Sequence, residues 1–452
     1  MLEEIGHYVD AQINEIDTVG DEGELFSYLV RGINLTDAQL NIIRQEYDHQ
    51  IIVVDDQEIA IETGIGQLIT TPITTSTTPI SIIGTGTQGT DLNIGVAIAF
   101  GGSISSTGTG AATITIIGNG ATDASGVGNY GIILQGDTST ITSVDGAIDL
   151  TGKGGSGTDF NVGVILLIES KIDSTGTASI NITGNGSLLT AGVGNDGVRI
   201  EGNSSVNSIS GNITITGTAG TGSQQNQGVL LVSNGLITSE TGNITVNGTG
   251  GSTGISNYGV WLTSGGSITS TGTEANASQI NIIGNGSTTA TGNIDNDGVR
   301  IDGTNSKVSS VAGAISITGT AGNGTNGNRG VVVFDNGIVT SETGNITVHG
   351  TGNGTGSENY GVYIINGGKI SSTGSSTIII NGQGSLTEAN GNGNDGVRVE
   401  GENSVISSID SLINIQGTGG NGNNFNRGVW LEQKGQITTE TGTITINGTA
   451  QS

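Results

Sequence analysis

The stretch Asn257-Tyr-Gly-Val-Trp-Leu262 is one of eleven that share the order Asn, any residue, Gly, then Val or Ile. Successive asparagines are 31 to 39 residues apart, yet every copy keeps both the Asn and the Gly. A repeat of this length is typical of a supersecondary unit that buries its apolar face only against its neighbours. The sequence therefore predicts a solenoid of stacked copies. The asparagines are Asn93, Asn129, Asn161, Asn195, Asn226, Asn257, Asn296, Asn328, Asn359, Asn394 and Asn426.

An alternating pattern follows each of these glycines. Two aliphatic residues with one residue between them recur in all eleven copies, as in Val260 and Leu262, and this period of two indicates a half-buried β-strand. Each copy then offers two more short apolar stretches, such as 236–239 and 243–246. Three strands and three corners per copy predict a mainly β fold: a three-sided parallel β-helix, or β-solenoid, of about eleven turns. At ~4.8 Å between adjacent strands, such a rod is roughly 50 Å long.

The first part of the chain has a different pattern. Residues 1–62 predict a small α+β unit with a helix over residues 2–14, a second helix that begins at Thr36, and a β-hairpin over residues 51–61. Residues 63–79 are rich in Thr and contain both prolines of the chain, which indicates a linker or an irregular first turn. We expect the repeats to occupy residues 80–452.

Composition excludes several classes of protein. The 452 residues include 83 Gly and no Cys, so neither a disulfide framework nor a thiolate metal site is possible. The net charge of −28 disfavours nucleic acid and anionic lipid as partners. No run approaches the 18 apolar residues of a membrane span, so membrane insertion is not expected. The acidic start, Met1-Leu-Glu-Glu4, does not predict a signal peptide, so an export signal would lie elsewhere.

The eleven asparagines predict a structural ladder. Stacked at one corner, each side chain is expected to hydrogen-bond to the next along the axis, as amides do in stacked strands. The Gly two residues later is expected to let the backbone turn with a positive φ. The alternative is a row of amides that binds a ligand.

Six residues are candidates for surface recognition, and each lies in the first strand of a different copy. Three arginines are each followed two positions later by Glu201, Asp302 or Glu400, and exposed ion pairs of this kind are worth ~0.2–1 kcal/mol. Three aromatic residues take the same outward position, and aromatic rings of this kind stack on sugars when exposed. Ordinary solvated pairs and scattered surface aromatics are the alternative. The six are Arg199, Trp261, Arg300, Tyr363, Arg398 and Trp430.

The sequence offers little for catalysis. It contains three histidines, and no cluster of carboxylates or basic residues recurs on adjacent turns, so we do not expect an enzyme. The segment Glu3-Glu-Ile-Gly-His7 resembles the metal-binding pattern His-Glu-x-x-His, with Glu3 in place of the first His. Glu3 and His7 are therefore weak candidates for a metal site. We expect no cofactor, although acidic loops could bind calcium weakly.

Two segments resemble known families. Leu2-Glu-Glu-Ile-Gly-His7, followed by Asp21-Glu-Gly23 and the expected hairpin, is similar to a short module of large exported cyanobacterial proteins. The repeats resemble those of filamentous-haemagglutinin-like adhesins and other β-strand-repeat exoproteins. This resemblance implies a secreted or cell-surface location.

The sequence thus predicts a non-enzymatic extracellular rod with a structural or adhesive role. We expect self-association through the solenoid ends into a filament, since unpaired end strands invite pairing. Cell-surface glycans are a further expected partner. The alternative function is a β-helix protein that binds carbohydrate or degrades polysaccharide.

Overall fold

The computed structural model describes residues 49–54, 57–62, 65–87, 89, 91–110, 112–187, 192–252, 254–287, 294–387 and 391–451, with side chains from residue 65 onward. Throughout these ranges the regular secondary structure is β, and no helix there could cross a membrane. The predicted helices of the first 48 residues lie outside the described residues, as do Glu3 and His7.

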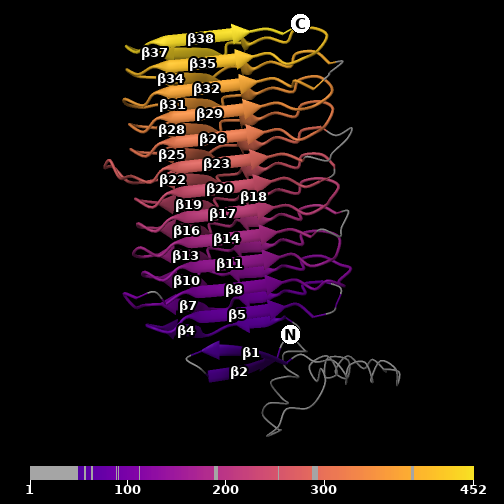
Figure 1. Ribbon diagram of the computed structural model, residues 1–452, viewed down its shortest axis with the longest axis vertical. Helices are drawn as coiled ribbons and strands as arrows, with labels where there is room; N and C mark the ends of the chain where they lie inside the picture. Colours follow the sequence, from indigo (N-terminus) through magenta and orange to yellow (C-terminus); the bar gives the residue numbers. More distant parts are fainter. Residues whose placement is uncertain are drawn as a thin grey trace.

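Three sheets run the length of the molecule and form the sides of a β-solenoid (Figure 1). The chain passes from sheet B to sheet C to sheet A and then begins the next coil. Eleven coils begin with an Asn-x-Gly phrase, and one further coil, residues 67–85, precedes them. The predicted three-sided parallel fold is therefore confirmed.

The strands belong to the sheets as follows. Sheet A consists of β1 (His49–Val54), β2 (Gln57–Glu62), β5 (Ile80–Thr85), β8 (Ile114–Asn119), β11 (Ile148–Lys153), β14 (Ile180–Asn185), β17 (Ile213–Thr218), β20 (Ile244–Thr249), β23 (Ile280–Asn285), β26 (Ile315–Thr320), β29 (Ile346–Thr351), β32 (Ile378–Gln383), β35 (Ile413–Thr418) and β38 (Ile444–Thr449). Sheet B consists of β3 (Gln67–Ile69), β6 (Val96–Ile98), β9 (Ile132–Gln135), β12 (Val164–Leu167), β15 (Val198–Ile200), β18 (Val229–Leu231), β21 (Val260–Leu262), β24 (Val299–Asp302), β27 (Val331–Phe334), β30 (Val362–Ile365), β33 (Val397–Glu400) and β36 (Val429–Glu432). Sheet C consists of β4 (Pro72–Thr75), β7 (Ser103–Ser106), β10 (Thr140–Ser143), β13 (Lys171–Ser174), β16 (Ser205–Ser208), β19 (Leu236–Ser239), β22 (Ser267–Ser270), β25 (Lys307–Ser310), β28 (Ile338–Ser341), β31 (Lys369–Ser372), β34 (Val405–Ser408) and β37 (Gln436–Thr439).

The core is a continuous column of β-branched and Leu side chains from all three sheets. In a typical coil, Val260 and Leu262 of β21, Ile268 of β22, and Ile280 and Ile282 of β23 point inward and are 0–1% exposed. β-Branched side chains pack well on a pleated surface, so the same few residue types serve in every coil. The aliphatic pairs predicted to point inward do so.

The N-terminal end of sheet A carries a hairpin. β1 and β2 pair antiparallel, and β1 also pairs antiparallel with β5 through Val53 and Ser81. The hairpin expected over residues 51–61 is present in the backbone and adds two strands to the end of sheet A. Residues 67–69 and 72–75, within the expected linker or irregular first turn, form β3 and β4 of the first coil.

The residue with positive φ at the corner before each sheet B strand is not the glycine for which we expected it. In all eleven copies the residue just before the Asn has a positive φ, for example 56° at Ser256 and 73° at Gly128. The Gly of the phrase does not. It is required by close contact: a Cβ on Gly259 would lie 2.3 Å from the backbone N of Asn285 and 2.6 Å from the carbonyl oxygen of Gly298. The predicted positive φ at this Gly is therefore wrong, because the left-handed residue stands three positions earlier.

Candidate recognition surface on the outer face of sheet B

The eleven asparagines lie buried, each at the corner before a sheet B strand, and connect successive coils by hydrogen bonds. Each backbone N–H from Asn93 to Asn394 donates to the side-chain oxygen of the asparagine one coil later, at 2.9–3.1 Å. In several coils the amide nitrogen donates to the same oxygen, at 2.8 Å from Asn129 to Asn161. All eleven side chains are buried, at most 6% exposed in Asn93. The row thus satisfies backbone donors inside the molecule and presents no amide to a ligand.

A second ladder runs beside the first, at the residue between Asn and Gly. Asp196 accepts a 2.7 Å hydrogen bond from the backbone N–H of Gln227, whose own side-chain oxygen accepts one of 2.7 Å from the N–H of Tyr258. Asp297 and Asp395 accept in the same way from Arg329 and Arg427. A polar side chain between the Asn and the Gly of the phrase thus adds a hydrogen bond to the next coil, outside the apolar core.

All six residues predicted for surface recognition lie in one row along the outer face of sheet B. Strand register places them in the order Arg199, Leu230, Trp261, Arg300, Val332, Tyr363, Arg398 and Trp430, each paired with the next. We call these eight residues the outer row. An arginine occurs in every third coil of the outer row. Trp261 and Tyr363 lie between arginines, and Trp430 follows the last one.

The arginines of the outer row are mostly buried. Arg300 contacts the fully buried Asp297 at 3.1 Å and Asp302 at 2.6 Å, and its side chain is 14% exposed. Arg199 has the same arrangement with Asp196 and Glu201 and is 20% exposed. Arg398 pairs with Glu400 at 2.9 Å and with Glu432. The expectation of exposed pairs is therefore wrong, because Arg199 and Arg300 each meet a buried aspartate of the adjoining corner and Arg398 meets two glutamates at the ends of sheet B strands.

Aromatic rings enclose these guanidinium groups. Arg300 lies 5.3 Å from the ring centre of Tyr258 and 5.0 Å from that of Phe334. Near the C-terminal end, the ring of Trp430 lies 4.2 Å from Arg398 and 3.6 Å from Arg427. Contacts of this kind contribute about 0.5–2 kcal/mol, the larger values where the cation is desolvated. Outside the apolar core, the protein thus has a layer of alternating cations and rings.

Hydrogen bonds fix two of the rings. Trp261 Nε1 donates to Asp302 at 3.1 Å, and the Tyr363 hydroxyl donates to Glu400 at 2.6 Å. Tyr363 is only 8% exposed, so the expectation of an exposed ring at this position is wrong, and the neighbouring Val332 is only 1% exposed. Trp261 and Trp430 are half-buried and keep part of their surface open.

Burial changes the acidity of the aspartates in the second ladder. Burial raises the pKa of Asp196 to about 6, against the opposing effects of Arg199 and the hydrogen bond from Gln227. Burial also raises the pKa of Asp395 to about 6. The pKa of Asp297 is raised by burial as well, although Arg329 and Arg300 lower it. Asp196 and Asp395 can therefore gain a proton under weakly acidic conditions.

Sequence reasoning missed half of this surface. The residue between Asn and Gly was treated as variable, yet it supplies Asp196, Asp297, Asp395, Tyr258 and Tyr360. The sequence does contain a signal for this role. In the later copies, the residue between Asn and Gly is Asp at 196, 297 and 395, each time three positions before an arginine of the next strand.

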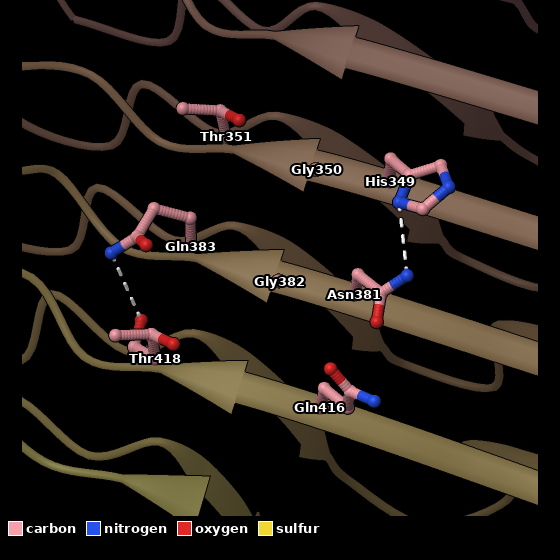
Figure 2. Close-up of a pocket in the computed structure, with 8 residues that line it drawn as sticks. All are labelled: His349, Gly350, Thr351, Asn381, Gly382, Gln383, Gln416 and Thr418. Carbon is pink, nitrogen blue, oxygen red and sulfur yellow. Dashed lines mark hydrogen bonds between the residues drawn. The ribbon is translucent and has the colours of Figure 1, made fainter.

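One shallow hollow, of about 240 Å³, lies on the outer face of sheet A (Figure 2). Its walls are polar side chains of three successive strands, including His349, Asn381 and Gln416. His349 Nδ1 and Asn381 Nδ2 are 3.0 Å apart and hydrogen-bonded. Among the described residues, no group of three His, Cys, Asp or Glu side chains is placed to hold a metal ion.

Comparisons with known proteins give little beyond this geometry. No family model and no curated protein matches the chain. Among solved structures, the chain is similar to a hyper-glycosylated fragment of TibA, residues 55–350, whose glycosylation was catalysed by TibC. The identity is 14%, the match covers 83% of this chain and 97% of that fragment, and the TM-score is 0.18. At that TM-score, the likeness carries no argument about function.

Proposed function

We propose that this chain is a non-enzymatic extracellular rod with a structural and adhesive role, secreted or held at a cell surface. One observation carries the proposal: all three sheets continue in unbroken parallel register from the first coil to the last. Neighbouring coils share one core and the asparagine ladder, and bonds of the second ladder join some of them, so the coils are held to one another. The net charge of −28 keeps such a rod soluble.

We further propose that copies of the chain associate end to end. In the last described coil, β36 to β38, the core-facing residues Leu431, Ile444 and Ile446 are 37–45% exposed. The three strands also end their sheets, so each has one unpaired edge. Unpaired edges with apolar side chains are templates for another strand, and a second copy can supply it.

Sedimentation velocity over a range of concentrations tests this association. The wild-type chain should form species that grow with concentration. Ile446→Glu places a charge on the exposed apolar end and should leave single rods. Thr438→Glu is the matched control, because Thr438 lies in the same coil on the outer face of sheet C, and it should associate like wild type. A wild-type chain that remains a single rod at every concentration contradicts the proposal.

Glycan binding is the second candidate function, favoured by the open parts of Trp261 and Trp430. Both rings are half-buried, and five coils, or about 24 Å, separate them along the rod. A screen of neutral and acidic polysaccharides with Trp261→Ala and Trp430→Ala tests this function. Loss of binding in both variants supports it, and unchanged binding contradicts it.

A further inference from the structure

The outer face of sheet A differs from the rest of this acidic protein. Its twelve parallel strands, β5 to β38, each turn three side chains outward, and the register aligns these in three straight files. Of the 36 side chains, 16 are Thr and nine are Asn. Only Asp149 and Lys153 carry a full charge, although the chain holds 40 Asp and Glu residues. Charge is thus nearly absent from the face.

Several hydroxyl groups on this face are available for hydrogen bonds. Within the described part of sheet A, Thr214, Thr216, Thr218 and Thr318 are partly exposed, and their side chains make no hydrogen bond to the protein. Sheet C provides the contrast, because its outward hydroxyls pair with one another between coils. Examples are Thr142 with Ser105 at 2.9 Å, Thr269 with Ser309 at 3.2 Å, and Ser371 with Thr340 at 3.1 Å.

The files form a regular two-dimensional lattice. Neighbours within a file are ~4.8 Å apart, and neighbouring files on the same strand are about 6.6 Å apart. The sheet A strands lie one above another along the rod (Figure 1). The hollow at His349, Asn381 and Gln416 interrupts the lattice (Figure 2). From β17 to β26, away from the hollow, seven of the twelve outward side chains are Thr.

We propose that the outer face of sheet A binds ice. Ice is a neutral lattice of water oxygens that repeats in two dimensions, so its recognition needs regularly spaced groups and no net charge. Each Thr offers a hydroxyl that can take a lattice position and a methyl group that limits other arrangements of the bound water. Ordered water between protein groups is nearly as favourable as a direct hydrogen bond.

A crystalline polysaccharide is the other neutral lattice to consider. Sugar rings have an apolar face, and proteins commonly cover that face with aromatic side chains. The 36 outward positions of sheet A contain no Phe, Tyr or Trp. The composition of the face therefore favours ice over a polysaccharide.

Partition of the labelled full chain into a slowly growing ice hemisphere tests the proposal, together with inhibition of ice recrystallisation. The wild-type chain should concentrate in the ice. Thr216→Lys and Thr318→Lys place a long charged side chain in the middle file and should abolish both effects. Thr238→Lys and Ser407→Lys are the controls, because they occupy outward positions of sheet C, and they should behave like wild type.

Thermal melting followed by circular dichroism must show that all four variants fold. Exclusion of the wild-type chain from ice overturns the proposal, and so does equal loss in the sheet C variants. The same samples are mixed with crystalline cellulose and chitin. Binding to either polymer, with exclusion from ice, overturns the proposal in favour of a polysaccharide ligand.

Discussion

Oδ1 of Asp196 accepts a 2.7 Å hydrogen bond from the backbone N–H of Gln227, the corresponding residue one coil later, although the Asp196 side chain is fully buried. Arg199, at 3.4 Å, is the cation that partners this carboxylate. Outside the core, the solenoid thus contains a layer in which buried carboxylates lie beside arginines. Two buried systems, the apolar column and this layer, hold successive coils together.

This arrangement makes stability depend on pH. The pKa of Asp196 is raised to about 6 in the folded chain, so between about pH 4 and pH 6 the folded state binds more protons than the unfolded state. The free energy of unfolding should therefore fall as the pH rises through that window. Asp196→Asn keeps an acceptor oxygen but cannot ionise, so the fall should be smaller. Urea unfolding at several pH values measures it.

The exposed Asp137 supplies the control for this prediction. Asp137→Asn removes one negative charge from a turn between β9 and β10 and should leave the pH dependence as in wild type. Identical pH profiles for Asp196→Asn and wild type would show that the buried carboxyl does not contribute.

The asparagine row should be energetically important in every coil. Asn257→Ala leaves the buried backbone N–H of Asn226 without its 2.9 Å acceptor, which costs about 1–3 kcal/mol. Asn247→Ala, on the outer face of sheet A in the preceding coil, should cost less than about 0.5 kcal/mol. Urea unfolding, with hydrogen exchange at the Asn226 amide as a local measure, checks both values. Equal losses in the two variants contradict a special role for the row.

The glycine of the phrase should not tolerate even a methyl group. Gly259→Ala would place a Cβ 2.3 Å from the backbone N of Asn285, at the end of β23, and 2.6 Å from the carbonyl oxygen of Gly298 in the next coil, and these backbone atoms cannot move without disturbing the sheets. Overpacking of this kind costs at least about 1–3 kcal/mol. Gly110→Ala has no atom within 4 Å of its Cβ and should be neutral. Thermal melting distinguishes the two, and a Gly259→Ala melting curve like that of wild type is the contrary result.

Buried ion pairs should contribute more to the free energy of unfolding than exposed ion pairs do. Arg300→Gln leaves the fully buried Asp297 with the backbone N–H of Arg329 at 3.0 Å and, as its one remaining cation, the Arg329 guanidinium at 3.9 Å. Loss of one partner from a buried pair costs about 3–5 kcal/mol, and Arg329 should bring the cost toward the lower figure. Lys434→Gln breaks a pair whose two side chains are 70% exposed, and it should have almost no effect. Similar melting temperatures for the two variants would refute the distinction.

The fold was predictable because its signals are local and repeated. The alternation after each Gly, as in Val260 and Leu262, decides which face of the strand is buried. A shift of the strand register by one residue would expose these apolar side chains to solvent. The hairpin of β1 and β2 was equally clear from two short apolar runs. The positive φ was assigned to the wrong residue of the phrase, because Ser256, Glu358 and Phe425 carry no glycine signal.

The outer layer was not predictable from one copy of the repeat. Whether Tyr363 or Arg398 is buried depends on what the next coil places beside it, and that residue is more than thirty positions away. The expectations of an exposed Tyr363 ring and of solvated ion pairs were wrong for this reason. The pairing of Arg398 with Trp430 and of Arg300 with Phe334 becomes visible only after strand register is known.

Negative-stain electron microscopy of the purified chain tests the proposed rod and its association most directly. We predict straight rods about 53 Å long, from the eleven steps of ~4.8 Å between twelve coils, that join end to end as the concentration rises. Ile446→Glu should leave only the short rods. Compact round particles, or single short rods of the wild-type chain at every concentration, would contradict the account.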